Sequence, residues 1–132
     1  MPVYVETLTD PSTQDRIDLA KIYADAPAWL LVPHADAEAL IDSSLADGSL
    51  IAGRFNDRLL GAAQLRRSAD HWQLSHLCVR KVTRRRGVGK RLLDESLRLA
   101  AEAGKPLRLA APAGHLDAQA LAARTHLPLD LI

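Results

Sequence analysis

Residues 83–90 of the chain read Thr83-Arg84-Arg85-Arg86-Gly87-Val88-Gly89-Lys90. This run joins residues 72–79, whose composition is typical of a strand, to residues 88–100, whose apolar positions recur at helical spacing. The first turn of a helix leaves backbone N–H groups without partners and carries the positive end of the helix dipole. Glycines allow phosphate oxygens to reach that backbone, and Arg and Lys add charge-assisted hydrogen bonds. The run therefore predicts a pyrophosphate-binding loop.

Two common phosphate-binding motifs do not fit this loop. A Walker A motif requires glycine where Arg84 stands and Ser or Thr where Arg91 stands, which argues against a nucleoside triphosphatase. A dinucleotide-binding motif requires a third glycine where Leu92 stands, and it comes early in a parallel sheet. The non-functional alternative is an exposed basic turn that opens a helix.

Outward from the loop, the pattern of apolar residues predicts the remaining elements. Alternation predicts strands over 3–8, 50–55, 59–65, 72–79, 106–110 and 127–132. Helical spacing predicts helices from Ser12 or Thr13 to near Pro27, over 35–46, from 88 to Gly104, and over 116–123. No conformation is predicted for residues 29–33. This order predicts an α/β (α+β) fold with a single mixed central sheet and flanking helices, in one domain spanning 1–132.

The same patterns predict which side chains are buried and where the chain turns. In the first helix, Ile17, Leu19, Ile22 and Tyr23 form the expected buried side. In the strand over 72–79, Trp72, Leu74 and His76 are expected on one face. Residues 56–58, Asn56-Asp57-Arg58, predict a hairpin turn.

Composition limits the classes of function. The chain has 132 residues, 48% of them apolar and 25% charged, as in an ordinary globular domain. The single cysteine, Cys78, excludes an internal disulfide framework. A net charge of +1 argues against binding nucleic acid or membranes over a wide surface, yet the seven Lys and Arg within 80–91 have no acid among them. This favours one compact anionic ligand. The sequence shows neither a secretory signal nor an apolar run of about 20 residues, so we expect a cytoplasmic protein.

The pattern Arg84-x-x-Gly87-x-Gly89, with its preceding strand and following amphipathic helix, resembles the acyl-CoA signature of the GCN5-related N-acetyltransferase (GNAT) superfamily. The resemblance implies the GNAT fold, with acetyl-CoA or CoA as cofactor and a preceding strand that bulges and separates from its neighbour. It implies backbone contacts to the cofactor from Leu77, Cys78 and Val79. It also implies that the diphosphate is surrounded by Thr83, Arg84, Arg85, Arg86, Gly87, Val88, Gly89 and Lys90. We interpret Cys78 as a packing residue rather than a nucleophile, because this chemistry is direct transfer.

Catalysis would require a base and an acid as well as the cofactor. GNAT members often use a Glu on the central strands and a Tyr on the last helix. Here residues 75–76 are Ser75 and His76, and residues 124–126, where the Tyr would fall, are Arg124-Thr125-His126. We assign no catalytic residue and no metal site. His76 is the candidate base, its unperturbed pKa being near neutrality, although a structural strand histidine is the more frequent case.

Several segments resemble one GNAT branch, the aspartate 1-decarboxylase maturation factors PanZ and PanM. They are Gln14-Asp15-Arg16-Ile17-Asp18-Leu19 with Lys21-Ile22, Arg54-Phe55-Asn56, Arg58-Leu59-Leu60, Val79-Arg80, and residues 82–89. The resemblance implies a module that binds the decarboxylase zymogen when loaded with acetyl-CoA or CoA and promotes the self-cleavage that forms its pyruvoyl group, linking pantothenate synthesis to CoA supply. Members also lack the usual Tyr.

Within that resemblance, Asn56 matches a position at the partner interface, and residues 84–86 are candidates to face the partner as well. Residues 28–47 are longer than the family pattern, and 105–132 match it poorly. Two alternatives remain open: an active N-acetyltransferase acting on a small-molecule or protein amine, and a nucleic-acid binder using the arginine cluster. The second lacks stacking aromatic residues near the cluster, so we expect no nucleic-acid partner.

Overall fold

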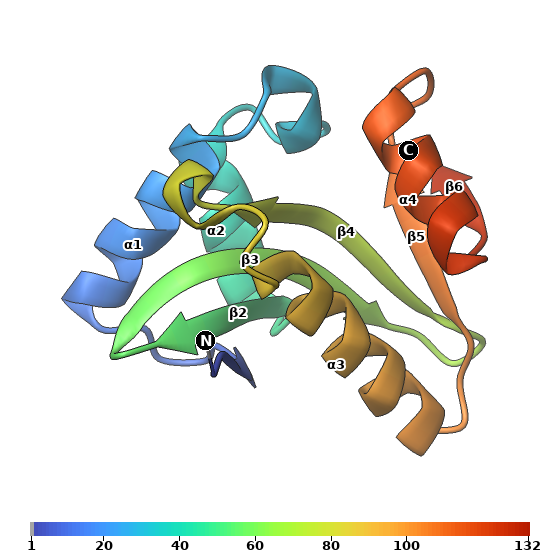
Figure 1. The fold of residues 1–132 in the computed structure, drawn as a ribbon, viewed down its shortest axis with the longest axis horizontal. Coiled ribbons are helices and arrows are strands. Elements are labelled where there is room, and N and C mark those ends of the chain that lie inside the picture. Colours follow the sequence, from blue (N-terminus) through green and yellow to red (C-terminus); the bar gives the residue numbers. More distant parts are fainter. Residues whose placement is uncertain (1) are drawn as a thin grey trace.

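The computed structural model describes residues 2–132. They form a twisted sheet with the strand order β1-β2-β3-β4-β5-β6 (Figure 1). The strands are β1 (Tyr4–Thr7), β2 (Leu50–Phe55), β3 (Arg58–Arg67), β4 (Trp72–Val79), β5 (Leu107–Ala111) and β6 (Leu129–Leu131). The pairs from β1 to β4 are antiparallel, whereas β5 pairs parallel with both β4 and β6. The mixed α/β sheet predicted from the sequence is confirmed.

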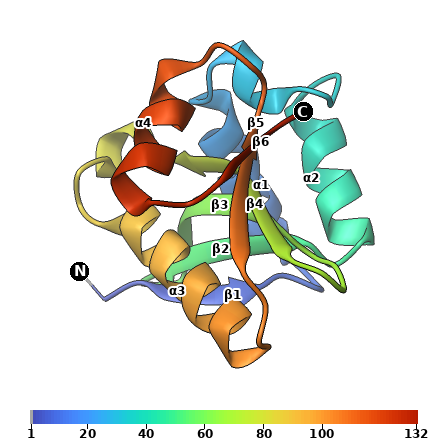
Figure 2. The same ribbon diagram turned by 90° about the vertical axis from the view of Figure 1, so that its right-hand side faces the viewer.

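Helices cover both faces of this sheet. They are α1 (Thr13–Ala24), α2 (Ala37–Ala46), α3 (Val88–Glu102) and α4 (Leu116–Thr125), with short 3₁₀ turns η1 (Ala28–Leu31) and η2 (Lys81–Thr83). Two apolar clusters divide the core: one joins α1 and α2 to the sheet, and the other joins α3 and α4 to it. Figure 2 shows these two pairs of helices on opposite sides of the strands. The predicted order of elements is confirmed, and η1 occupies the stretch for which no conformation was predicted.

Two glycines let α3 lie close to the sheet. A Cβ atom at Gly61 would lie 2.9 Å from the side chain of Val88, and one at Gly53 would lie 3.5 Å from Val88 and 2.9 Å from Val3. Val88 is the first residue of α3 and is buried in the core beside Leu92. Because these strand positions lack side chains, the start of α3 is fixed against β2 and β3.

The buried face of α1 differs from the prediction. Ser12 caps the helix, with Asp15 completing a capping box. Leu19, Ile22 and Tyr23 are buried as predicted, but Ile17 is 44% exposed, so its predicted burial is wrong. Asp15 and Asp18 are buried instead. The face of α1 that is turned toward the sheet therefore includes Asp15 and Asp18 rather than Ile17. The apolar spacing could not show this, because the two arginines that neutralise these acids come from another part of the chain.

Those arginines flank the tip of the β2–β3 hairpin. Asn56 and Asp57 form its turn with φ of +48° and +66°, the left-handed conformation that matches the twist of paired strands. On one side of the turn, Arg54 lies 2.9 Å from Glu6 and 3.0 Å from Asp15. On the other, Arg58 donates to Asp18 at 2.8 Å, and the Leu59 N–H donates to the same carboxylate at 3.1 Å. The exposed tip is therefore held against α1.

The Asp18 carboxylate is the most buried member of this network, at 1% exposure. Its burial alone would raise its pKa, but hydrogen bonds from Arg58, Gln14 and the Leu59 N–H outweigh that effect and lower the pKa below its ordinary value of 3.8. The carboxylate is thus stabilised in its ionised form in the folded state.

Replacing Asp18 with Asn should lower the free energy of unfolding by about 2 kcal/mol at neutral pH, because it removes charge-assisted hydrogen bonds to a buried group. Urea unfolding measures this. The control is Asp42→Asn, which breaks the exposed pair with Arg16 and should change stability by less than about 0.5 kcal/mol. If the two substitutions lowered the free energy of unfolding equally, the stabilising role assigned to the Asp18 hydrogen bonds would be contradicted.

The pH dependence of stability gives a second test of the Asp18 hydrogen bonds, with the original chain and Asp18→Asn as the two proteins compared. Because the pKa of Asp18 is lower in the folded state, its stabilisation is complete above the unfolded value near 4 and is lost as the pH falls through the folded value. The stability gap between the original chain and Asp18→Asn should therefore narrow below about pH 4. A gap that stays constant to about pH 2 would contradict this origin of the effect.

Candidate functional site

β4 separates from β5 halfway along its length. The two strands pair at Trp72–Leu107, Gln73–Arg108 and Leu74–Leu109, and the pairing ends there, while β4 continues against β3 as far as Val79. Between Ser75 and Val79 the β4 backbone is thus paired along one edge and open along the edge that faces β5. The separation of these strands, expected from the GNAT resemblance, is confirmed.

A bulge in β4 accompanies this separation. Gln64 pairs with Ser75 but Ala62 pairs with Cys78, so two residues of β4 lie opposite one of β3. His76, within the bulge, has φ of +56°, and its carbonyl accepts a hydrogen bond of 2.8 Å from the Tyr23 hydroxyl. The extra residue breaks the alternation of the strand. The prediction that His76 shares a face with Trp72 and Leu74 is therefore wrong, and its ring reaches Val32, just after η1.

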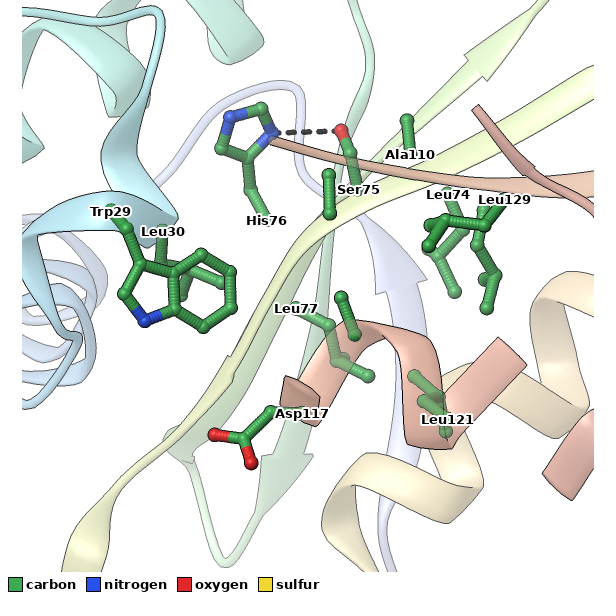
Figure 3. A pocket seen from close by; sticks show the side chains of 13 residues that line it. Trp29, Leu30, Leu74, Ser75, His76, Leu77, Ala110, Asp117, Leu121 and Leu129 are labelled. Atoms are coloured by element: carbon green, nitrogen blue, oxygen red, sulfur yellow. Dashed lines mark hydrogen bonds between the residues drawn. The ribbon is translucent and has the colours of Figure 1, made fainter. Parts of the chain in front are cut away.

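Both ring nitrogens of His76 have partners. Nε2 lies 2.9 Å from the Val32 carbonyl, which can only accept, so Nε2 carries the proton and donates. Nδ1 lies 2.7 Å from the Ser75 hydroxyl and accepts from it (Figure 3). Burial lowers the pKa of His76, and the nearby His34 acts in the same direction, so the neutral ring is favoured. In this arrangement the ring holds no free lone pair for a substrate proton.

Three connected pockets form a cleft along the open edge of β4. The inner chamber, of about 130 Å³, lies where β4 and β5 separate. The entrance lies between the end of α1 with η1 and the loop before α3. The α3–α4 groove lies between those two helices. Leu77 and Asp117 line all three, so the pockets meet at these two side chains.

The start of α3 opens onto this cleft. Gly87 is its N-cap, with φ of +85°, and no side chain in the described part of the chain caps the helix. The first helical hydrogen bond runs from the Arg91 N–H to the Gly87 carbonyl. Within residues 2–132, the N–H groups of Val88, Gly89 and Lys90 have no acceptor. Gly89 lines both the entrance and the α3–α4 groove, so this donor set faces the cavity.

The cleft brings together about half of the cofactor-binding residues predicted from the sequence. Leu77, Cys78, Val79, Arg84, Gly89 and Lys90 line the entrance or the α3–α4 groove. The others lie beside it: Thr83 donates to the Arg80 carbonyl, Arg85, Arg86 and Gly87 are exposed, and the Val88 side chain is in the core. Val88 can therefore reach a ligand only through its backbone.

Asp25, the C-cap of α1, holds the basic loop in place. Its carboxylate accepts from the Lys81 N–H at 2.9 Å and from Arg80 Nε at 3.4 Å, and its carbonyl accepts from Arg84 at 3.2 Å. The hydrogen bond from the Lys81 N–H is the main cause of the lowered pKa of Asp25. One ionised side chain thus orders the loop ahead of α3.

Cys78 faces the core between β4 and α1. Its thiol lies 3.3 Å from the Ile22 carbonyl, and burial raises its pKa to about 11. A thiol in this state is a poor nucleophile at neutral pH. Its geometry agrees with a packing role, with its backbone next to the cleft.

Two residues of the cleft were missed by sequence reasoning. Trp29, on η1, stacks on His115 before α4 with ring centroids 4.2 Å apart, and so bridges the two sides of the cleft. Asp117 is the acidic residue in the first turn of α4. The only sequence signal for Asp117 was its place at the start of the helix predicted over 116–123. Trp29 lies in the stretch for which no conformation was predicted.

The structure also locates residues 124–126, where a general acid would be expected, and the two tyrosines of the chain. Arg124 and Thr125 line the α3–α4 groove, and His126 ends α4. Tyr4 is exposed on β1, and Tyr23 is buried with its hydroxyl engaged by the bulge. Neither tyrosine lines any of the three pockets.

None of the helices formed by residues 2–132 has the length and apolar character needed to cross a bilayer.

Comparison with known sequences gives consistent matches. Residues 2–129 match the family model described as an acetyltransferase (GNAT) domain, PanZ. The PanD regulatory factor of Escherichia coli (strain K12) is 41% identical over 87 residues, which cover 66% of this chain and 60% of that protein. The PanD regulatory factor of Salmonella typhimurium is 41% identical over 88 residues, with the same coverage. The aligned part thus spans less than two thirds of these relatives.

Solved structures share the fold at low sequence identity. The PaiA N-acetyltransferase of Thermoplasma acidophilum, in complex with coenzyme A, has a TM-score of 0.69 and 16% identity, covering 95% of this chain and 89% of that one. The N-acetylglutamate synthase of Neisseria gonorrhoeae, complexed with coenzyme A and N-acetyl-glutamate, has a TM-score of 0.67 and 20% identity, covering 94% of this chain and 28% of that one. At these identities the likeness concerns the fold alone.

Proposed function

This chain belongs to the PanZ family of acetyltransferase (GNAT) domains, and on that basis we propose that it is a regulator of aspartate 1-decarboxylase that acts when acetyl-CoA or CoA is bound. Loaded with this cofactor, it binds the decarboxylase and promotes the self-cleavage that forms the pyruvoyl group. The observation that carries the proposal is the uncapped start of α3, which opens onto the free edge of β4.

The cofactor part of the proposal follows from the chemistry of the cleft. The N–H groups of Val88, Gly89 and Lys90 would donate to the diphosphate, and Arg84 and Lys90 would supply positive charge at the cavity wall. The pantetheine arm would lie along residues 75–79 and pair with the open backbone as an added strand does. Its thioester end would then point to the inner chamber. Structures of the same fold that contain coenzyme A support this assignment.

A regulatory rather than catalytic role is supported by two features. The relatives with the PanD regulatory factor name share 41% of aligned residues with this chain. His76, the candidate base, has both nitrogens hydrogen-bonded, and no tyrosine lines the cleft formed by residues 2–132. Such a site would hold a thioester without the groups that usually activate an amine and protonate the leaving thiolate. We also propose that the protein acts in the cytoplasm, as expected from the sequence.

The partner surface would include the tip of the β2–β3 hairpin. Asn56 is exposed there, and the ion pairs of Arg54 and Arg58 with α1 hold the turn in one position. A fixed exposed amide can both donate and accept a hydrogen bond across an interface. Asn56 is therefore the proposed partner-binding residue.

Replacing Gly89 with Trp should weaken acetyl-CoA binding by more than about 100-fold in calorimetry, because the indole would occupy the diphosphate space. A Cβ at this position would lie 3.6 Å from Val79, an ordinary contact, so a side chain can begin here without a clash with the backbone. The matched control is Glu102→Trp at the far, exposed end of α3, which should bind acetyl-CoA normally. Normal binding by Gly89→Trp would contradict the placement of the diphosphate.

The same variant tests the regulatory proposal. Unprocessed decarboxylase mixed with this protein and acetyl-CoA should form a complex and cleave faster than it does alone, and Gly89→Trp should abolish both effects. If wild-type protein that binds acetyl-CoA neither forms a complex nor changes the cleavage rate, the regulatory proposal is wrong. Release of CoA in the presence of a panel of amines would support the acetyltransferase alternative instead.

Replacing Asn56 with Gly should weaken the complex with the decarboxylase by about tenfold or more and leave acetyl-CoA affinity unchanged. Glycine adopts the positive φ of this turn without strain, so only the side chain is lost. Asp57→Gly, at the neighbouring turn position, is the control and should retain the complex. Binding of the decarboxylase is measured by calorimetry in saturating acetyl-CoA, and undiminished binding by Asn56→Gly would remove this residue from the interface.

A further inference from the structure

Asp117 occupies the junction of the cleft. It lies in the first turn of α4 and lines the inner chamber, the entrance and the α3–α4 groove. Figure 3 shows its carboxylate projecting from the start of α4, away from the body of that helix. Among residues 2–132 it has neither a salt-bridge partner nor a side-chain hydrogen bond. A ligand that extends from the start of α3 to the inner chamber would therefore pass close to Asp117 and Leu77.

The inner chamber beyond this junction is mostly apolar. Its wall includes Leu74, Leu77, Leu109, Leu121 and Leu129, together with Trp29. The polar side chains of its wall are Ser75 and His76, which bond to each other, and Asp117. Among residues 2–132, no lysine or arginine lines the chamber. A negatively charged group inside the chamber would therefore be removed from water, would have no cation as partner, and would lie close to another carboxylate.

We propose that Asp117 and the apolar chamber select CoA thioesters whose acyl group is short and uncharged, and exclude thioesters that carry a carboxylate on the acyl group. This inference rests on the proposed function, because it assumes that the acyl end of a bound CoA thioester reaches the chamber. Asp117 is a specificity-determining residue in this proposal and has no role in gripping the diphosphate.

Two physical effects act in the same direction. Burial of an unpaired charge in an apolar site is costly, and that cost applies to a malonyl or succinyl group and not to an acetyl group. Repulsion between like charges adds a further, smaller penalty, because Asp117 itself is exposed at the mouth of the chamber and water screens part of its charge. An acetyl group has neither penalty and buries its methyl group against leucine side chains.

Calorimetry with acetyl-CoA, malonyl-CoA and adenosine 3′,5′-bisphosphate tests the inference on the original chain and on Asp117→Asn. The original chain should bind malonyl-CoA at least about tenfold more weakly than acetyl-CoA. Asp117→Asn should reduce that difference to about threefold or less by strengthening malonyl-CoA binding, since the repulsion is gone while the volume is kept. The bisphosphate, which lacks the pantetheine arm and acyl group, should bind both proteins equally.

The matched control is Asp10→Asn, which makes the same change in net charge at an exposed position outside the three pockets. It should keep the full preference for acetyl-CoA. Equal affinities of the original chain for the two thioesters, or an unchanged preference in Asp117→Asn, would overturn the inference and leave the proposed function standing. Failure of the original chain to bind acetyl-CoA at all would overturn the proposed function and this inference with it.

Discussion

The backbone N–H groups at the start of α3 are hydrogen-bond donors that the fold leaves free and holds in fixed positions. A helix end normally finds a side-chain cap, but here the N-cap is glycine and the first-turn donors have no acceptor within residues 2–132. The surrounding structure fixes them in that state. Val88 packs against Gly61, which fixes the start of α3 on the sheet. The pairing of β4 with β5 ends at Leu74, which leaves the cleft open, and Asp25 orders the loop that precedes α3. The donors are thus positioned for an anion before it arrives, which reduces the entropy lost on binding.

Helix α1 links the two regions to which we assign function. Its acidic residues Asp15 and Asp18 hold the exposed hairpin turn, and Asp25 at its end holds the basic loop. Tyr23 of the same helix donates to the carbonyl in the β4 bulge. The sequence string that resembles the PanZ branch, residues 14–19, therefore has a structural explanation: its two aspartates are the acceptors for Arg54 and Arg58 of the hairpin string.

The sequence was sufficient for features set by local chemistry. Apolar spacing predicted every strand and α-helix formed by residues 2–132, and Ser12 was one of two candidate caps. The phosphate-binding role of the arginine–glycine run stays a prediction. Features set by distant contacts were missed. Strict alternation put His76 on the wrong face because a bulge, stabilised by Tyr23 from another element, inserts one residue. Helical spacing buried Ile17 because the arginines that neutralise Asp15 and Asp18 lie about 40 positions away. Asp117 could be identified only from the folded structure, in which it lines all three pockets.

Nuclear magnetic resonance of the backbone amides can detect whether the first-turn N–H groups of α3 bind the diphosphate of the cofactor. Titration of ¹⁵N-labelled protein with acetyl-CoA should shift the amide protons of Val88, Gly89 and Lys90 strongly downfield, as expected for new hydrogen bonds to charged oxygens. Saturable binding that leaves these three resonances in place, with the largest shifts in another part of the chain, would show that the diphosphate binds elsewhere.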